Sequence, residues 1–239
     1  MTCEEKRERL KKIRCFVLDM DGTIYLGNRL FPFTPAFLQA VEKSGREFCY
    51  FTNNSSKNAA TYLQKLASMG IPTTPEKMLI SNGVIIDWLN RNHPGKSVYL
   101  VGTPELEEAF RLGGISLNDH NPDAVVLGFD TTLTYEKLEK ACRFVREGKP
   151  FYGVNPDFNC PVENGFIPDC GSMAALIQAS TDVTPEFFGK PSRHTLEYLL
   201  KHTGCREEEL AVIGDRLYTD IKIAQGTAVT SILVLTGET

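Results

Sequence analysis

The fold is indicated first by the stretch Cys15-Phe16-Val17-Leu18-Asp19-Met20-Asp21-Gly22-Thr23. Its apolar half predicts a buried strand, and its polar half predicts a sharp turn directly after that strand. Side chains alternate along a strand, so Asp19 and Asp21 are expected to project to the same side. Gly22 permits a turn tight enough for the backbone to approach a ligand.

Two carboxylates at this spacing favour one of two kinds of chemistry. Like charges held close together raise one another's pKa unless a cation lies between them. The pair therefore indicates either an acid–base couple that shares a proton or a site for a hard metal ion such as Mg²⁺. The alternative is a plain turn in which Asp and Gly supply only turn chemistry.

The composition is that of an ordinary globular enzyme. The chain has 239 residues, a hydrophobic content of 42% and a net charge of −4. This length predicts one large domain or two modest ones. The acidic balance argues against a nucleic-acid-binding protein, and no apolar stretch is long enough to cross a bilayer. Because residues 1–9 carry charges of both signs with no apolar segment behind them, we expect no signal peptide and a cytoplasmic location.

The seven cysteines are an odd number and contain no C-x-x-C pair. They are expected to be reduced, mostly buried thiols rather than a disulfide or zinc framework. Cys160 and Cys170 flank a predicted loop, and the sequence leaves open whether they interact.

Predicted strands and helices alternate along the chain, which is typical of parallel sheets with crossover helices. Thr34-Pro35 is expected to cap and open a helix that ends at Gly45. Residues 47–51 predict a strand, followed by Thr52-Asn53-Asn54-Ser55-Ser56 and a helix that runs toward Gly70. Such a polar segment before a helix can bind an anion, although plain helix capping explains it equally well.

Residues 81–182 repeat this alternation and are predicted to form an inserted α/β domain. The first domain would then comprise residues 1–80 and 183–239. Ser81 is expected to cap the first helix of the insertion, and residues 155–170 are expected to form a long loop. The other elements predicted in the insertion are helices over 81–88, 104–112, 135–146 and 172–179, and strands over 98–101, 124–127 and 150–154.

Two later strand ends also carry charged residues. Lys190 follows Phe187-Phe188-Gly189, and its ammonium suits a phosphate or a carboxylate, although most lysines are solvated surface residues. Asp215 ends the predicted strand 210–214, and Asp220 follows it as a further carboxylate or as a helix cap. Ligands of an open parallel sheet bind beyond the carboxyl ends of its strands. The strand ends are therefore expected to converge on one site for Mg²⁺ and phosphate, formed by Asp19, Asp21, Thr52, Asn53, Lys190 and Asp215.

The chain resembles the haloacid dehalogenase (HAD) superfamily, in its NagD-like or para-nitrophenylphosphatase-like branch. The four superfamily motifs occur in order, as Asp19-Met20-Asp21-Gly22-Thr23, Thr52-Asn53, Gly189-Lys190-Pro191, and Gly214-Asp215 with Asp220. Gly128-Phe129-Asp130 and Asn155-Pro156-Asp157 resemble the inserted cap of that branch. The resemblance implies a Rossmann-like core, a parallel sheet with helices on both faces, and an α/β cap inserted between the second and third motifs.

The resemblance also implies a function, namely Mg²⁺-dependent hydrolysis of small phosphate monoesters such as sugar phosphates or nucleoside monophosphates. Asp19 would be the nucleophile that becomes an aspartyl-phosphate, and Asp21 would act as general acid and then general base. The residues implied as Mg²⁺ ligands are Asp19, Asp21 through its backbone carbonyl, and Asp215. The residues implied as phosphate-binding are Thr52, Asn53, Asn54 and Lys190. Asp220 would support Asp215 or Lys190 without touching the ion.

Closure of the cap would bring Asp130 and the loop with Asn155 and Asp157 toward the leaving group, so substrate specificity is expected there. An ordinary exposed loop has the same composition. Other functions also fit parts of the pattern: a non-catalytic or regulatory protein on this fold, a phosphomutase, or a receiver-like signalling domain. The last has no place for Asp21 as acid and base.

The chain ends at Gly237-Glu238-Thr239, where members of the family usually continue with another strand and helix. An uncovered last strand is expected to lower stability or to favour a homodimer, and the sequence leaves open whether this end is natural or truncated.

Overall fold

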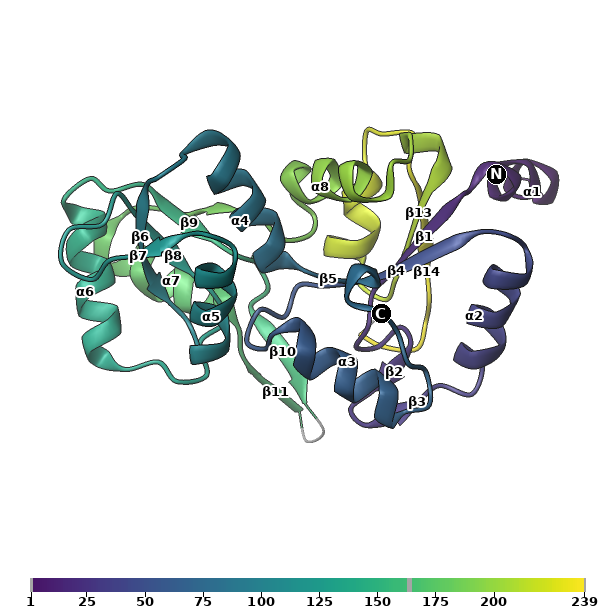
Figure 1. Ribbon diagram of the computed structural model, residues 1–239, viewed down its shortest axis with the longest axis horizontal. Coiled ribbons are helices and arrows are strands. Elements are labelled where there is room, and N and C mark those ends of the chain that lie inside the picture. Colours follow the sequence, from purple (N-terminus) through teal and green to yellow (C-terminus); the bar gives the residue numbers. More distant parts are fainter. Residues whose placement is uncertain (1, 163–164, 239) are drawn as a thin grey trace. The chain divides into compact units, whose positions relative to one another are not determined.

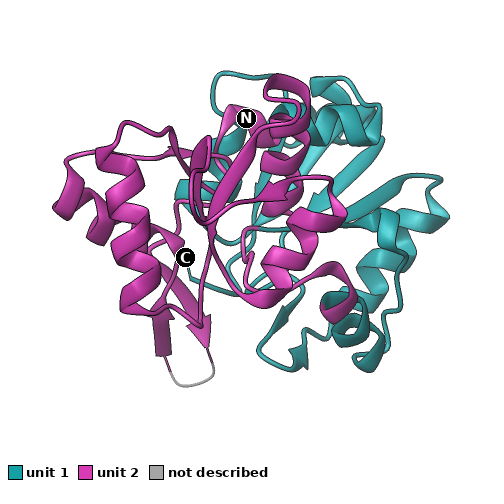
Figure 2. Cartoon of the chain, turned by 60° about the vertical axis from the view of Figure 1, so that its left-hand side comes forward, with its two compact units in different colours: residues 1–52, 62–79, 196–239 teal, residues 53–61, 80–195 magenta. Residues whose placement is uncertain are grey.

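The computed structural model of the protein describes residues 2–162 and 165–238 (Figure 1). The chain divides into two compact units, and each contains a parallel sheet of its own with helices (Figure 2). Unit 1 comprises residues 1–52, 62–79 and 196–239, and unit 2 comprises residues 53–61 and 80–195. The predicted α/β fold class is confirmed. The assignment of residues 81–182 to a cap stays a prediction, and unit 2 also includes residues 53–61 and 183–195.

The sheet of unit 1 has β1 at its centre, with strands on both sides of it. Its strands, in the order in which they lie side by side, are β14 (Thr230–Leu233), β13 (Leu210–Gly214), β1 (Cys15–Leu18), β4 (Glu47–Thr52) and β5 (Met78–Ile80). All four residues of β1 are buried, as expected for a central strand of a parallel sheet. Leu18 pairs in parallel with both Ile213 and Tyr50. The carboxyl ends of β1, β13 and β4 therefore reach the same edge.

Short elements and helices complete unit 1. The helices are α1 (Cys3–Lys12), α2 (Thr34–Lys43), most of α3 (Ala59–Ser68) and most of α8 (Arg193–Thr203), and β2 (Tyr25–Leu26) pairs with β3 (Arg29–Leu30) as an antiparallel hairpin. A π-helix spans Leu217–Ile221, and 3₁₀-helices span Pro75–Lys77, Glu207–Glu209 and Lys222–Ala224. The expectation that Thr34 caps α2 is wrong, because Phe33 occupies the cap position and the Thr34 hydroxyl donates to the carbonyl of Ile24.

The sheet of unit 2 is also parallel. Its strands, in spatial order, are β12 (Glu186–Phe187), β9 (Phe151–Gly153), β8 (Ala124–Leu127), β6 (Ser97–Val101) and β7 (Ser116–Leu117). Its helices include α4 (Ser81–Asn92), α5 (Pro104–Leu112), α6 (Tyr135–Arg146) and α7 (Cys170–Thr181). Val125, Leu127, Phe144 and Ile177 lie in its hydrophobic core. The bounds predicted for β8, α5 and α6 are confirmed.

Three predictions about unit 2 are wrong. The segment expected to be a loop contains an antiparallel hairpin of β10 (Asn159–Val162) and β11 (Gly165–Pro168). Because this hairpin is mostly exposed and contains prolines, its sequence lacks the pattern of a buried strand. Ser81 does not cap α4 but is its first residue, and its hydroxyl donates to the carbonyl of Asn53. The strand before Lys190, β12, pairs with β9 of unit 2 and not with the sheet of Asp19.

Cys160 and Cys170, whose interaction the sequence left open, are not joined by a disulfide. Five of the thiols are buried, Cys160 is half-buried and Cys3 is exposed. The prediction that the thiols are mostly buried is confirmed, and their reduced state stays a prediction. Within the part of the chain that the structure describes, every helix is too short or too polar to cross a membrane.

Candidate active site

Asp19 and Asp21 lie in the turn that follows β1. The strand ends at Leu18, so strand alternation does not govern the two carboxylates, and their projection to the same side stays a prediction. The backbone instead folds back on itself, with the N–H groups of Thr23 and Ile24 donating to the carbonyl of Met20. Gly22 has φ +88°, a left-handed conformation that favours glycine.

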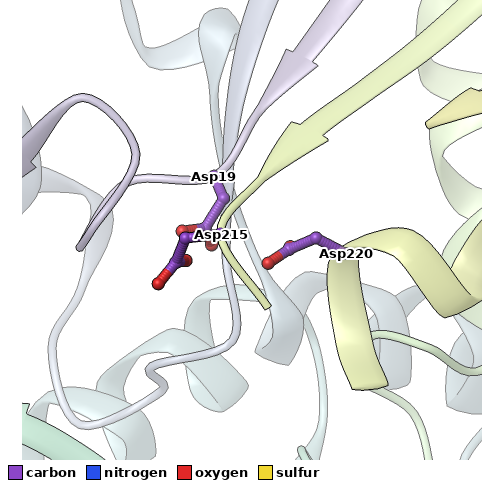
Figure 3. Close-up of side chains that lie close together, drawn as sticks. All are labelled: Asp19, Asp215 and Asp220. Atoms are coloured by element: carbon purple, nitrogen blue, oxygen red, sulfur yellow. The ribbon is translucent and has the colours of Figure 1, made fainter. Parts of the chain in front are cut away.

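Three carboxylates meet at the edge of the unit 1 sheet (Figure 3). Asp19 follows β1, Asp215 follows β13, and Asp220 lies in the π-helix after it. One oxygen from each lies within 4.8 Å of the others. Asp215 and Asp220 are buried, with 2% and 0% of their surface exposed. Oxygen donors at this spacing are what a hard divalent cation requires.

The environment of Asp215 supports that interpretation. Burial is the main cause that raises the pKa of the Asp215 carboxyl, and the charge of Asp220 raises it further. A hydrogen bond from the backbone of Glu238 lowers the pKa but does not offset the two. The Glu238 N–H donates to Oδ2 over 2.7 Å. Oδ1 is buried and has no hydrogen-bond partner within residues 2–162 and 165–238. A buried carboxylate oxygen without a donor is costly, and a bound cation would satisfy it.

Asp220 lies closer to the other two carboxylates than its sequence position suggested. Its Oδ2 accepts a hydrogen bond from the backbone N–H of Arg216 over 3.2 Å. Gly214 leaves the space that this side chain fills, because a Cβ there would collide with Asp220. The structure therefore makes Asp220 a candidate ligand in addition to its predicted supporting role.

Asp21 is held by two residues that the sequence analysis missed. The Tyr25 hydroxyl donates to Oδ2 over 3.2 Å, and the Lys65 ammonium lies 3.8 Å from Oδ1 and 3.8 Å from the centre of the Tyr25 ring. Burial, and then the charge of Asp21, raise the pKa of Tyr25, so its hydroxyl stays protonated and donates. Nothing in the sequence distinguishes Lys65 from other helical lysines, because the contact is made through the fold.

The contact of Thr23 with Asp19 was also not predicted, although Thr23 belongs to the first motif and could have been found there. Its hydroxyl donates to Asp19 Oδ2 over 3.2 Å. Thr52, the predicted phosphate ligand of the second motif, is the buried last residue of β4.

Asn53, Asn54 and Lys190 belong to unit 2. The Asn53 side chain bonds to the backbone of Lys190 and to Asp157, and the side-chain oxygen Oδ1 of Asn54 accepts from the N–H and hydroxyl of Ser56. Lys190 is only 2% exposed, so the alternative of a solvated surface lysine is wrong. Lysine is almost never buried at this level unless it is paired.

The residues predicted to determine substrate specificity are buried within unit 2. Asp130 is 1% exposed, and its oxygens accept from the Lys137 ammonium over 2.7 Å and from the N–H and hydroxyl of Thr132. Asn155 and Asp157 are 0% and 4% exposed. Contact of any of the three with a substrate stays a prediction.

Unit 2 also contains a cavity of about 440 Å³ between α5, α6 and the strands β6 and β7. The cations on its wall pair with carboxylates of the same unit: Arg111 with Glu107, Lys137 with Asp130, and Lys140 with Glu136. Because their charges are already balanced, the cavity offers a phosphate little electrostatic attraction.

Comparison with known proteins identifies the family. Residues 16–116 match the model of the haloacid dehalogenase-like hydrolases, and residues 187–239 match a second, HAD-hydrolase-like model. An acid sugar phosphatase of Staphylococcus epidermidis is 34% identical over 229 residues, which are 95% of this chain and 88% of that protein.

The chain belongs to the haloacid dehalogenase-like hydrolase family. The structure of 4-nitrophenylphosphatase from Thermotoga maritima is similar with a TM-score of 0.93 and 42% identity, over 97% of this chain and 89% of that one. NagD from E. coli K-12 is similar with a TM-score of 0.88 and 29% identity, over 95% and 89% of the two chains. The predicted branch of the HAD superfamily and the predicted enzyme class, a phosphoric monoester hydrolase, are confirmed.

Proposed function

We propose that the protein is a Mg²⁺-dependent phosphatase that hydrolyses small phosphate monoesters, sugar phosphates in particular, through an aspartyl-phosphate. The observation that carries the proposal is the cluster of Asp19, Asp215 and Asp220, which includes the unpartnered Oδ1 of Asp215. The similarity to an acid sugar phosphatase and to a 4-nitrophenylphosphatase supports the reaction and the substrate class.

Asp19 and Asp215, with the backbone carbonyl of Asp21, would hold Mg²⁺, and Asp220 lies close enough to contribute. The bound ion would offset the repulsion among the carboxylates and withdraw charge from the phosphoryl group.

Asp19 would act as the nucleophile. The hydrogen bond from Thr23 engages its Oδ2 and fixes the orientation of the carboxylate. Attack on phosphorus forms the bond between a carboxylate oxygen and phosphorus and breaks the bond between phosphorus and the ester oxygen. Water would then attack phosphorus, break the bond between the Asp19 oxygen and phosphorus, and release inorganic phosphate with the Asp19 carboxylate restored.

Asp21 would move the protons. It would protonate the leaving alkoxide, and its carboxylate would then accept a proton from the attacking water. Tyr25 and Lys65 hold this side chain, which is 29% exposed and so remains accessible. Thr52, the backbone amides at Asn53 and Asn54, and Lys190 would stabilise charge on the phosphoryl oxygens.

A panel of sugar phosphates, nucleoside monophosphates and p-nitrophenyl phosphate, assayed with Mg²⁺, tests the proposal. We expect release of inorganic phosphate, and we expect Asp19→Asn to abolish it without unfolding the protein. Asp87→Asn is the matched control, because Asp87 pairs with Arg91 on α4. Retained activity in Asp19→Asn would exclude Asp19 as nucleophile, and transfer of phosphate to a second position of the substrate would indicate a mutase.

A further inference from the structure

We propose that Asp157 is a positioning residue, which acts through Asn53 on Lys190 instead of contacting the leaving group. The inference rests on the proposed role of Lys190 in binding the phosphoryl group. All three residues belong to unit 2, so the arrangement is described within one compact body.

The Asn53 side chain pairs with the backbone of Lys190 in both directions. Its Oδ1 accepts from the Lys190 N–H over 2.8 Å, and its Nδ2 donates to the Lys190 carbonyl over 3.0 Å. This pair of bonds resembles the pairing between neighbouring strands, with a side-chain amide in place of a peptide. It fixes the backbone from which the lysine side chain extends.

Asp157 holds the amide of Asn53 in that orientation. Its Oδ2 accepts from Asn53 Nδ2 over 2.9 Å and from Asn155 Nδ2 over 3.1 Å. Asn155 Nδ2 also donates to Asp169 Oδ1, the cap of α7. A carboxylate can only accept, so it holds the NH₂ end of Asn53 toward itself and leaves Oδ1 for the Lys190 N–H.

Close packing supports the same role. A Cβ at Gly189 would lie 2.8 Å from Asn53 Oδ1 and 2.8 Å from the Cβ of Asn155, so the chain before Lys190 lies directly against these amides. Asn53, Asn155 and Asp157 are all at most 7% exposed. A lysine side chain has much rotamer freedom, and fixing its backbone reduces the volume that the ammonium can reach.

The two roles of Asp157 predict different measurements. A residue that contacts the leaving group changes the ranking of substrates when it is replaced. A residue that positions Lys190 weakens binding of the phosphate group itself, by the same factor for every ester. Inorganic phosphate has no leaving group and therefore separates the two roles.

The experiment measures the dissociation constant of inorganic phosphate by calorimetry in Mg²⁺ buffer, and kcat/KM for p-nitrophenyl phosphate and a sugar phosphate. For Asp157→Ala we expect roughly tenfold weaker phosphate binding and an equal loss of kcat/KM for both esters. A tenfold change is about what the loss of one charge-assisted hydrogen bond costs. Asn53→Asp is expected to lose more phosphate affinity than Asp157→Ala, because it places two carboxylates against each other. The double variant Asn53→Asp/Asp157→Asn exchanges the amide and the carboxylate, so a donor again faces an acceptor. It is expected to recover part of the phosphate affinity.

Asp123→Ala is the control for loss of stability. Asp123 also accepts hydrogen bonds in unit 2, from the N–H and hydroxyl of Ser97 and from Lys96. An equal loss of phosphate affinity in this control would overturn the inference, as would wild-type affinity in Asp157→Ala. A wild-type protein that binds no phosphate would also overturn it. A wild-type protein that binds phosphate but cleaves no ester would contradict the proposed function alone, and the affinities would still decide the role of Asp157.

Discussion

Replacing Gly22 with alanine tests whether the turn after β1 and Asp215 form one packed site. Gly22 has φ +88°, and an alanine Cβ would lie 2.5 Å from Asp215 Oδ2 and 2.8 Å from its Cγ. The substitution therefore strains the backbone and also displaces a carboxylate that we propose as a metal ligand.

Gly27 provides a matched control in the same unit. It has φ +59°, and an added Cβ would meet no heavy atom within 4 Å. A left-handed alanine is expected to lower the free energy of unfolding by about 1 kcal/mol at either position. Overpacking adds roughly 1–3 kcal/mol at Gly22 alone. The expected losses are therefore about 1 kcal/mol for Gly27→Ala and about 2–4 kcal/mol for Gly22→Ala.

Thermal denaturation and Mg²⁺ titration measure the two effects separately. Each kcal/mol corresponds to about 2–4 °C in Tm for a chain of this size, so Gly22→Ala is expected to lower Tm two to four times as much as Gly27→Ala. Only Gly22→Ala is expected to weaken Mg²⁺ binding, because only there does the new methyl group meet the carboxylate. Equal losses of Tm together with equal Mg²⁺ affinities would refute the reasoning.

Tyr25→Phe removes the hydroxyl that donates to Asp21 and keeps the buried ring. We expect kcat for p-nitrophenyl phosphate to fall by about two- to tenfold. An unchanged kcat would mean that this hydrogen bond does not orient Asp21. Asp21→Asn is expected to accumulate the aspartyl-phosphate, seen by intact mass after brief incubation with substrate, and normal turnover would exclude Asp21 from proton transfer. Mg²⁺ at 100 times its dissociation constant is expected to raise Tm by about 5–10 °C over protein in chelator, because binding then stabilises the native state by about 2.7 kcal/mol; an unchanged Tm would argue against the metal site.

Much of the fold could be predicted because its strands are continuous buried runs. β8, α5 and α6 were predicted with their observed bounds, and β8 is a run of four buried apolar residues. The structure adds that the side chains of Thr103 and Thr134 cap the two helices. The meeting of Asp19 and Asp215 follows from parallel strands in register, because their carboxyl ends must reach one edge.

The remaining features depend on contacts between distant parts of the chain. The hydroxyls of Thr34 and Ser81 have the composition of helix caps, but each donates to a carbonyl that the fold brings near. The two-residue strand β12 carries too little pattern to indicate which sheet it joins. The contact of Lys65 with Asp21 likewise exists only once α3 has packed in unit 1.

The buried thiols give each unit a reporter of its own opening. Cys15 and Cys49 lie in neighbouring strands of unit 1, whereas Cys142 and Cys170 lie in the core of unit 2. Burial raises the pKa of the Cys170 thiol, and alkylating reagents attack the exposed thiolate, so modification must wait until the surrounding structure opens. The labelling rate of each cysteine, followed by peptide mass spectrometry, therefore measures how often each of the two units opens, in the wild-type protein and without added cysteines.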